Sequence, residues 1–177
     1  LFLCPFDALG TAMATYCGQN IGALQYQRIY QGLKQSILVG FVYAALAALI
    51  LCTLGGRIGT VLFGLTDWTV IAYVRRFLIC TSLFYWLLSP LNTIRYSIQG
   101  VGFSALAVLS GVFELIGRGV VSQMITPRVG FTGVCFTDPT AWVAACLFLV
   151  PAFFWVMHHL QRNIAEQENP AERADQG

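Results

Sequence analysis

The chain has 177 residues, of which 57% are hydrophobic and 10% charged, whereas a soluble domain is about half apolar and about a quarter charged. This deficit of charge excludes an ordinary water-facing surface, and a mean hydropathy of +0.69 indicates a protein embedded in lipid. Ten Lys and Arg against eight Asp and Glu give a formal net charge of +2, which is too small to indicate a nucleic-acid partner.

Four apolar windows are long enough to cross a membrane, because a helical crossing takes about twenty predominantly apolar residues. In chain order they cover residues 36–54, 71–91, 105–125 and 141–160. A fifth apolar stretch, residues 1–17, begins without Met and without the basic start of a signal peptide. We therefore expect an all-α integral membrane protein, a helical bundle over residues 1–160, whose first helix continues from a missing N-terminal portion.

Glycine, proline and polar residues separate the windows. Residues 55–57 (Gly-Gly-Arg) are expected to end the first crossing, the segment 92–102 to follow the second after a break at Pro90, and Pro127-Arg128 to follow the third. Residues 161–177 form a polar, charged tail. We expect this tail to be disordered, and to be cytoplasmic because its side of the membrane has a slight excess of Lys and Arg.

The six cysteines are widely separated, with no C-x-x-C pair and no His positioned to complete a zinc site. They are interpreted as small apolar residues, and we expect neither a metal nor a cofactor. The sequence also has no cluster of a nucleophile with acid and base groups near the membrane interface, so an enzyme is not expected.

A polar element, Gly18-Gln19-Asn20-Ile21-Gly22-Ala23, follows the first apolar stretch. Gly18 and Gly22 permit close backbone approach or left-handed turns, and the amides of Gln19 and Asn20 can satisfy carbonyls freed at a helix end. The pattern predicts a helix terminus followed by a tight turn, with direct contact to a substrate as the alternative.

This element resembles the G-Q-N-x-G-A element of the multidrug and toxic compound extrusion (MATE) family, where it closes the second helix of each six-helix lobe at the cytoplasmic face. Residues 97–102 resemble the family's segment before helix eleven, although Gln99 replaces its usual Arg and Phe103-Ser104 replace its Asp-Thr. The resemblance covers residues 1–160. It implies the C-terminal six-helix lobe of a twelve-helix transporter, from the end of helix eight through helix twelve.

Charged residues within the crossings are costly, so each is a functional hypothesis with a partner to be found. Glu114 and Arg118 lie four residues apart in the third window and share a helix face, where they can neutralise each other. One interpretation is a structural ion pair. The other is that Glu114 exchanges protons or that the pair lines a transport cavity.

Asp7 and Asn92 are the other polar candidates. Asp7 follows Pro5 several helical turns before Asn20, which places it at membrane depth. Pro5 can loosen the helix there and free a carbonyl for an ion or water. Asp7 is either a coupling carboxylate or a polar helix-packing residue, and Asn92, after the expected break at Pro90, either packs or contributes to coupling.

The sequence thus predicts a secondary active efflux transporter, an antiporter that exports drugs or metabolites by alternating access. The coupling ion is expected to be a proton or sodium, and the substrate a small cationic or amphiphilic molecule. The expected partners are the missing N-terminal lobe and the lipid bilayer, and the expected location is the plasma membrane, the inner membrane of a bacterium. The alternatives are a lipid-linked oligosaccharide flippase, which needs a more cationic cavity, and a non-transporting structural membrane subunit.

Overall fold

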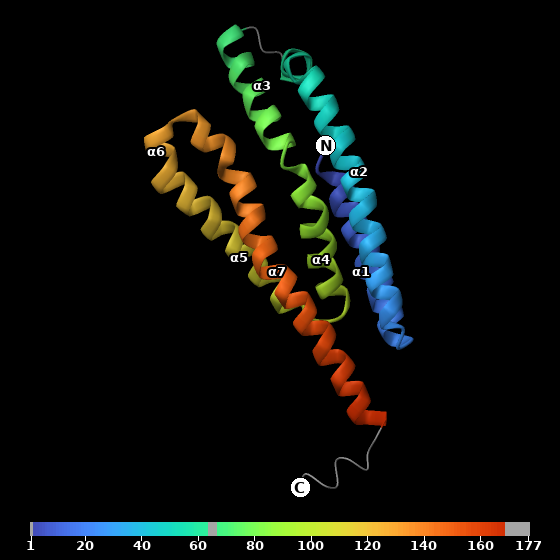
Figure 1. Ribbon diagram of the computed structural model, residues 1–177. Coiled ribbons are helices and arrows are strands. Elements are labelled where there is room, and N and C mark those ends of the chain that lie inside the picture. Colours follow the sequence, from blue (N-terminus) through green and yellow to red (C-terminus); the bar gives the residue numbers. More distant parts are fainter. Residues whose placement is uncertain (1, 64–66, 169–177) are drawn as a thin grey trace.

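The computed structural model describes residues 2–63 and 67–168, and within those ranges the chain forms helices joined by short turns, without a strand. Figure 1 shows the helices as long rods that run roughly along one direction. The all-α fold predicted from the sequence is therefore confirmed. The elements are, in chain order, α1 (Cys4–Gly22), α2 (Tyr26–Phe63), α3 (Trp68–Ser82), η1 (Tyr85–Leu87), α4 (Leu88–Gly100), α5 (Ser104–Val120), η2 (Val121–Ile125), α6 (Thr126–Val129) and α7 (Phe131–Glu168).

Three helical stretches are long and apolar enough to cross a membrane, namely Tyr26–Ile58, Ser104–Val129 and Phe131–Arg162. A fourth crossing is available if the bent pair Trp68–Ser82 and Tyr85–Gly100, whose axes differ by 42°, is taken as one broken span. Each of the four apolar windows overlaps one of these crossings. The helices are, however, longer than the apolar windows that predict them.

The expected end of the first crossing at residues 55–57 is wrong, because α2 continues through it to Phe63. Glycine in a helix interior costs only about 1 kcal/mol relative to alanine, and here it lets a neighbour approach. A Cβ added at Gly55 would meet Leu78, and one added at Gly56 would meet the side chain of Arg75, both at 3.8 Å or more. The two glycines thus lie where α3 packs against α2, at ordinary van der Waals distances.

The expected break at Pro90 and the loop over 92–102 are also wrong. The helix breaks before Pro90, at Leu83 and Phe84. There the backbone N–H of Leu83 donates to the carbonyl oxygen of Ile79, and that of Phe84 to the carbonyl oxygen of Thr81. Pro90 instead lies in the first turn of α4, where proline's missing N–H costs little. Residues 92–100 are helical as the second half of the broken span.

α5 and α7 form an antiparallel hairpin. α5 passes through the π-turn η2 into α6, and Gly130, with φ of 67°, reverses the chain into α7. Small residues bring the two arms together: a Cβ on Gly117 would lie 3.0 Å from the Cα of Ala141. α7 continues to Glu168, so residues 161–168 of the tail expected to be disordered are helical, consistent with the good helix formers Ala, Glu and Gln among them. The rest of the expected disordered tail, 169–177, lies outside the described residues.

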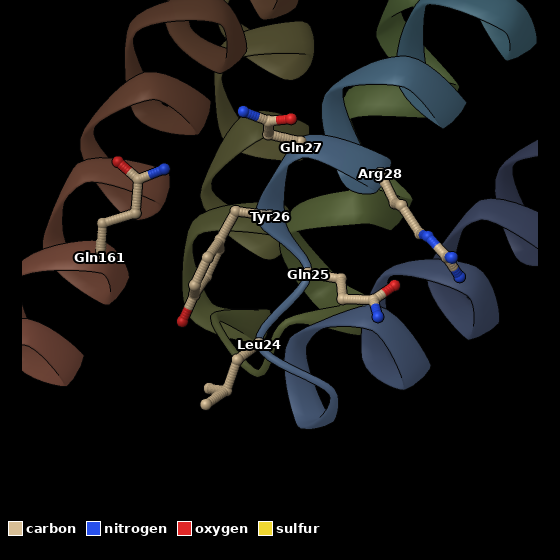
Figure 2. Close-up of a pocket in the computed structure, with 6 residues that line it drawn as sticks. All are labelled: Leu24, Gln25, Tyr26, Gln27, Arg28 and Gln161. Atoms are coloured by element: carbon tan, nitrogen blue, oxygen red, sulfur yellow. The ribbon is translucent and has the colours of Figure 1, made fainter. Parts of the chain in front are cut away.

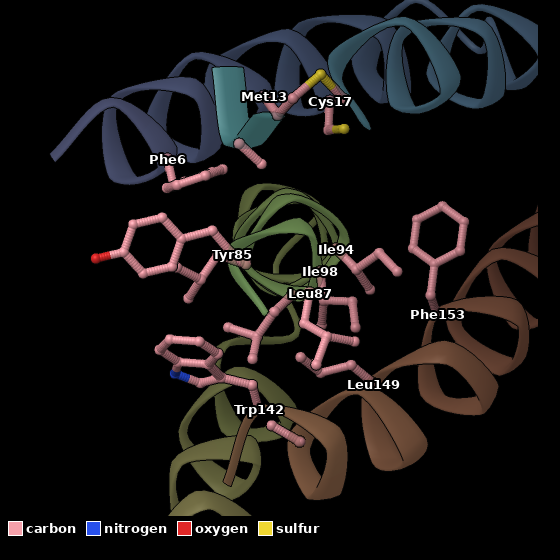
Figure 3. Packing of buried hydrophobic residues seen from close by; sticks show 14 of the residues in the cluster. Phe6, Met13, Cys17, Tyr85, Leu87, Ile94, Ile98, Trp142, Leu149 and Phe153 are labelled. Carbon is pink, nitrogen blue, oxygen red and sulfur yellow. The ribbon is translucent and has the colours of Figure 1, made fainter. Parts of the chain in front are cut away.

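The hydrophobic core surrounds α4. Figure 3 shows α4 nearly end-on, with residues of α1 on one side and of α7 on the other. Eight of its residues are buried: Leu88, Ser89, Leu91, Asn92, Thr93, Ile94, Ser97 and Ile98. Because four of these eight are polar, α4 must find hydrogen-bond partners inside the bundle.

Candidate functional site in the first and fourth helices

One face of α1 carries a row of exposed polar side chains at the spacing of a helical turn, formed by Asp7, Thr11, Thr15 and Gln19. The hydroxyl of Thr11 donates to the carbonyl oxygen of Asp7 at 2.8 Å, and that of Thr15 to the carbonyl of Thr11 at 3.4 Å. We call this row the α1 polar face. Polar groups at membrane depth turn toward protein or a water-filled cavity rather than lipid, so this face suits a transport pathway.

The structure brings together two residues that the sequence treats as separate candidates. The Nδ2 of Asn92 in α4 donates to Oδ1 of Asp7 at 3.0 Å. Asn92 is only 8% exposed, whereas Asp7 is exposed on the α1 polar face. Pro5 lies in the first turn of α1 and does not interrupt the described helix, so the polar environment of Asp7 comes from Asn92 and not from a proline kink.

Hydrogen bonds to α2 hold α4 in the position that presents Asn92. Ser89 Oγ donates to the carbonyl of Ile37 at 2.9 Å, and the hydroxyls of Ser36 and Thr93 lie 3.4 Å apart. A Cβ on Gly40 would lie 2.1 Å from Ser89 Oγ, so only glycine allows this approach. Asn92 therefore reaches Asp7 from a helix that is held against α2 by neighbouring residues.

Glu114, the second acidic candidate, has a different environment. Arg95 Nη2 donates to Glu114 Oε1, and Arg95 Nε donates to Ser110 Oγ at 2.9 Å. The expected partner, Arg118, is farther away, with its Nη2 at 3.8 Å from Glu114 Oε2. The predicted intrahelical pair is thus the weaker contact, because an arginine one helix away reaches the carboxylate with better geometry.

The charges continue into α7. Arg118 Nε lies 3.2 Å from Oδ1 of Asp138. Arg95, Glu114, Arg118 and Asp138 thus form a chain of alternating charges across α4, α5 and α7, which we call the charge ladder. Its formal charge is zero. Glu114 has a side chain 16% exposed, against 47% for that of Arg118, so the ladder is most buried at its α4 end.

Sequence reasoning misses Arg95 and Asp138. Arg95 lies in the segment expected to be a loop, and Asp138 precedes the window that predicts the last crossing. A usable signal was present: Glu114 and Asp138 are the two acids of the described crossings, and because buried charges are almost always paired, each requires a basic partner nearby.

The Gly-Gln-Asn element ends α1 as predicted. Asn20 Nδ2 donates to the carbonyl of Tyr16 at 2.8 Å, and the N–H of Gln25 bonds to the carbonyl of Asn20 at 2.9 Å. The left-handed residue in the turn is Leu24, with φ of 58°, rather than a glycine. Gly18 allows α1 to pack closely on α4, since a Cβ there would lie 3.2 Å from the carbonyl oxygen of Gly100.

An open hollow of about 500 Å³ lies beside this turn, and Figure 2 shows Gln161 of α7 facing the start of α2 across it. Most of the residues that line it carry a polar side-chain group; they are Leu24, Gln25, Tyr26, Gln27, Arg28 and Gln161. The hollow is separate from both Asp7 and the charge ladder. Gln19 and Gly22 of the motif do not line it, so the motif shapes the turn while the following residues form the hollow.

Among the residues described, no group of three or more His, Cys, Asp and Glu side chains is arranged to hold a metal ion. Among the described acids within the helices α1 to α5, Glu114 has basic partners, whereas Asp7 has one amide donor and an exposed carboxylate. A single carboxylate can bind and release a proton or a monovalent cation in exchange for a cationic molecule.

A comparison with protein-family models finds one match, to the family described as MatE, over residues 1–124. The matched region contains α1 to α5, with Asp7, Asn92, Arg95 and Glu114. No curated protein and no solved structure matches the chain significantly.

Proposed function

The chain belongs to the MatE family of transporters, and from this premise we propose that it is part of a cation-coupled exporter in which Asp7 is the coupling carboxylate. The chain is a multi-pass membrane protein. We place it in the plasma membrane, where an ion gradient can drive export, and assign it a small cationic or amphiphilic substrate. The α1 polar face, rather than the charge ladder, forms part of the pathway.

The observation that supports this proposal is the pairing of Asp7 with Asn92 alone. No Lys, Arg or His among the described side chains lies within ion-pair distance of Asp7. Asp7 lies roughly 22 Å along the helix axis from Gly22, at 1.5 Å per residue, which is within the thickness of a bilayer core. An acid there without a fixed counter-charge is costly unless a mobile cation neutralises it.

The mechanism follows from this charge deficit. A proton or sodium ion entering along the gradient neutralises Asp7, which removes the attraction that holds a cationic substrate, and the substrate leaves on the far side. Loss of the ion on the inner side restores the carboxylate and its affinity for the next substrate. The amide of Asn92 donates to the ionised carboxylate and so keeps its side chain oriented in the empty state.

Glu114 is less suited to this role. Two guanidinium groups lie within ion-pair distance of its carboxylate, so a coupling cation could bind there only by displacing one of them. The same pairing gives little support to a flippase, since Arg95 and Arg118 face carboxylates and are not available to bind the phosphates of a lipid-linked sugar. We therefore propose a structural role for the charge ladder.

The test compares Asp7→Asn with Asp67→Asn in the intact protein. Asp67 caps α3, its Oδ1 accepting from the N–H of Thr69 at 2.8 Å, and asparagine caps helices about as well as aspartate. With ethidium as substrate in everted vesicles, we expect Asp7→Asn to abolish efflux driven by a pH or sodium gradient at normal expression. Asp67→Asn should transport normally. Ion-driven efflux by Asp7→Asn at the wild-type rate would exclude Asp7 as the coupling residue.

A further inference from the structure

A second polar hollow, of about 550 Å³, lies between α2 and α3 near the ends that they share at the top of Figure 1. Two arginines line it, Arg57 from α2 and Arg75 from α3, together with Thr53, Gly56, Thr60 and Trp68. It lies at the opposite end of α2 from the Gly-Gln-Asn turn. It therefore belongs neither to the α1 polar face nor to the charge ladder.

The charges of these two arginines are not neutralised within the described part of the chain. No described carboxylate lies within 4.0 Å of either guanidinium, whereas Arg95 and Arg118 both have one. Arg76, the neighbour of Arg75, donates to the hydroxyl of Thr132 at 3.1 Å. The nearest acid in the sequence, Asp67, uses its carboxylate to cap α3. Two arginines in one hollow thus lack a counter-charge.

Gly56 and Trp68 form part of the wall of the hollow. The side chain of Arg75 passes beside Gly56, whose position for a Cβ lies 3.8 Å from the Cδ of Arg75, an ordinary van der Waals distance. Trp68, at the start of α3, is 82% exposed. An exposed indole at the end of a membrane helix is typical of the headgroup level of a bilayer.

We propose that this hollow binds a phosphate anion through Arg57 and Arg75, and that the phosphate is that of an anionic lipid headgroup. Guanidinium groups bind phosphate oxygens through paired N–H donors. The interfacial tryptophan and the apolar outer surface of α2 place the hollow beside lipid acyl chains, which favours a phosphodiester headgroup over a free anion. The inference is independent of the coupling role of Asp7.

The experiment measures stabilisation of the purified intact protein by added anions. Thermal unfolding in neutral detergent is followed while phosphatidylglycerol, phosphatidylcholine, inorganic phosphate or glycerol 3-phosphate is titrated. We expect phosphatidylglycerol to raise the melting temperature, and the double variant Arg57→Gln with Arg75→Gln to require at least tenfold more of it for the same shift. Both arginines are exposed, so their neutralisation should leave the fold intact.

The matched control is Arg128→Gln, which removes an exposed arginine in α6 that does not line the hollow. It should respond to phosphatidylglycerol as the parent does. The single variants Arg57→Gln and Arg75→Gln should each lose several-fold in apparent affinity, which keeps the test valid if the double variant is poorly folded. Stabilisation by inorganic phosphate or glycerol 3-phosphate, lost in the same variants, would identify a free anion as the ligand and overturn the lipid assignment. Equal responses of the parent and all variants would overturn the site itself.

Discussion

Asp7 in the first turn of α1 and Glu114 within α5 are two acids that differ in what surrounds the carboxylate. Asp7 accepts from one neutral amide and is exposed, whereas Glu114 faces two guanidinium groups and has a side chain 16% exposed. A carboxylate that already contacts two fixed cations can take up a mobile cation only if one of those contacts is broken. This contrast, and not the presence of an acid as such, separates a coupling residue from a structural one.

The structural role of Glu114 can be tested by replacing it with glutamine. Glu114→Gln leaves Arg95 without its main counter-charge in a largely buried position, and removing one member of a buried pair costs roughly 3 kcal/mol or more. We expect a lower melting temperature and less folded protein. Arg118→Gln should cost under about 1 kcal/mol, because Arg118 is far more exposed.

Replacing the Arg95–Glu114 pair by apolar residues distinguishes a structural role of this pair from a role in transport. Arg95→Met with Glu114→Leu removes both charges together, which is often tolerated in a protein interior. The double variant should recover most of the stability lost in Glu114→Gln and retain ion-driven efflux. Restored stability without ion-driven efflux would show that the ladder takes part in transport.

At the scale of elements, the crossing of α1 and α4 depends on Gly100. A Cβ there would lie 2.2 Å from the carbonyl oxygen of Ala14, which is backbone and cannot move aside easily. Gly100→Ala should therefore destabilise the protein by about 1–3 kcal/mol, as overpacking does, and displace Asn92 from Asp7. Reduced thermal stability together with weaker ion coupling is the expected result.

Gly111→Ala is the matched control for this prediction. Gly111 lies in α5, and nothing is within 4 Å of a Cβ placed on it. The alanine should be neutral or stabilising by up to about 1 kcal/mol, since alanine favours the helix. If the two variants melt alike, close approach at Gly100 does not determine how α1 packs on α4.

The elements differ in how far the sequence predicts them. Long apolar windows are enough to find α2, α5 and α7, because most of their surface is apolar. They fail for α4, in which Asn92, Thr93, Arg95 and Ser97 read as a polar loop. Ser97 donates to the carbonyl of Thr93 within α4, whereas Asn92, Thr93 and Arg95 have partners on other helices. Hydropathy cannot show such partners.

The candidate site shows the same limit. Asp7, Asn92, Glu114 and Arg118 can be selected from residue type and position, because charged and amide groups are rare in membrane helices. Residue type and position do not show which of these side chains contact one another. Asp7 and Asn92 are 85 residues apart in the chain, and the choice of Arg95 over Arg118 as the main partner of Glu114 depends on the crossing of α4 and α5.

At the scale of the whole molecule, the polar hollow of Figure 2 fixes which segments share a side of the membrane. Gln25 at the start of α2 and Gln161 near the end of α7 both line it. The three continuous crossings and the broken span lie between them. Four crossings are an even number, so the count of spans and the contact across the hollow agree. Both residues must then face the same compartment, and the basic bias of the loops favours the cytoplasm.

Cysteine labelling of intact cells tests this topology. Gln25→Cys and Gln161→Cys should both be protected from a membrane-impermeant maleimide until the cells are permeabilised, since each replaces a side chain on the hollow that we expect to face the cytoplasm. Trp68→Cys should react from outside without permeabilisation, because Trp68 is 82% exposed and is separated from Gln25 by a single crossing. The parent chain, labelled in parallel, accounts for its six native cysteines. If Gln25→Cys and Gln161→Cys differ in accessibility, the broken span does not cross the membrane, and α3 and α4 would instead form a re-entrant loop.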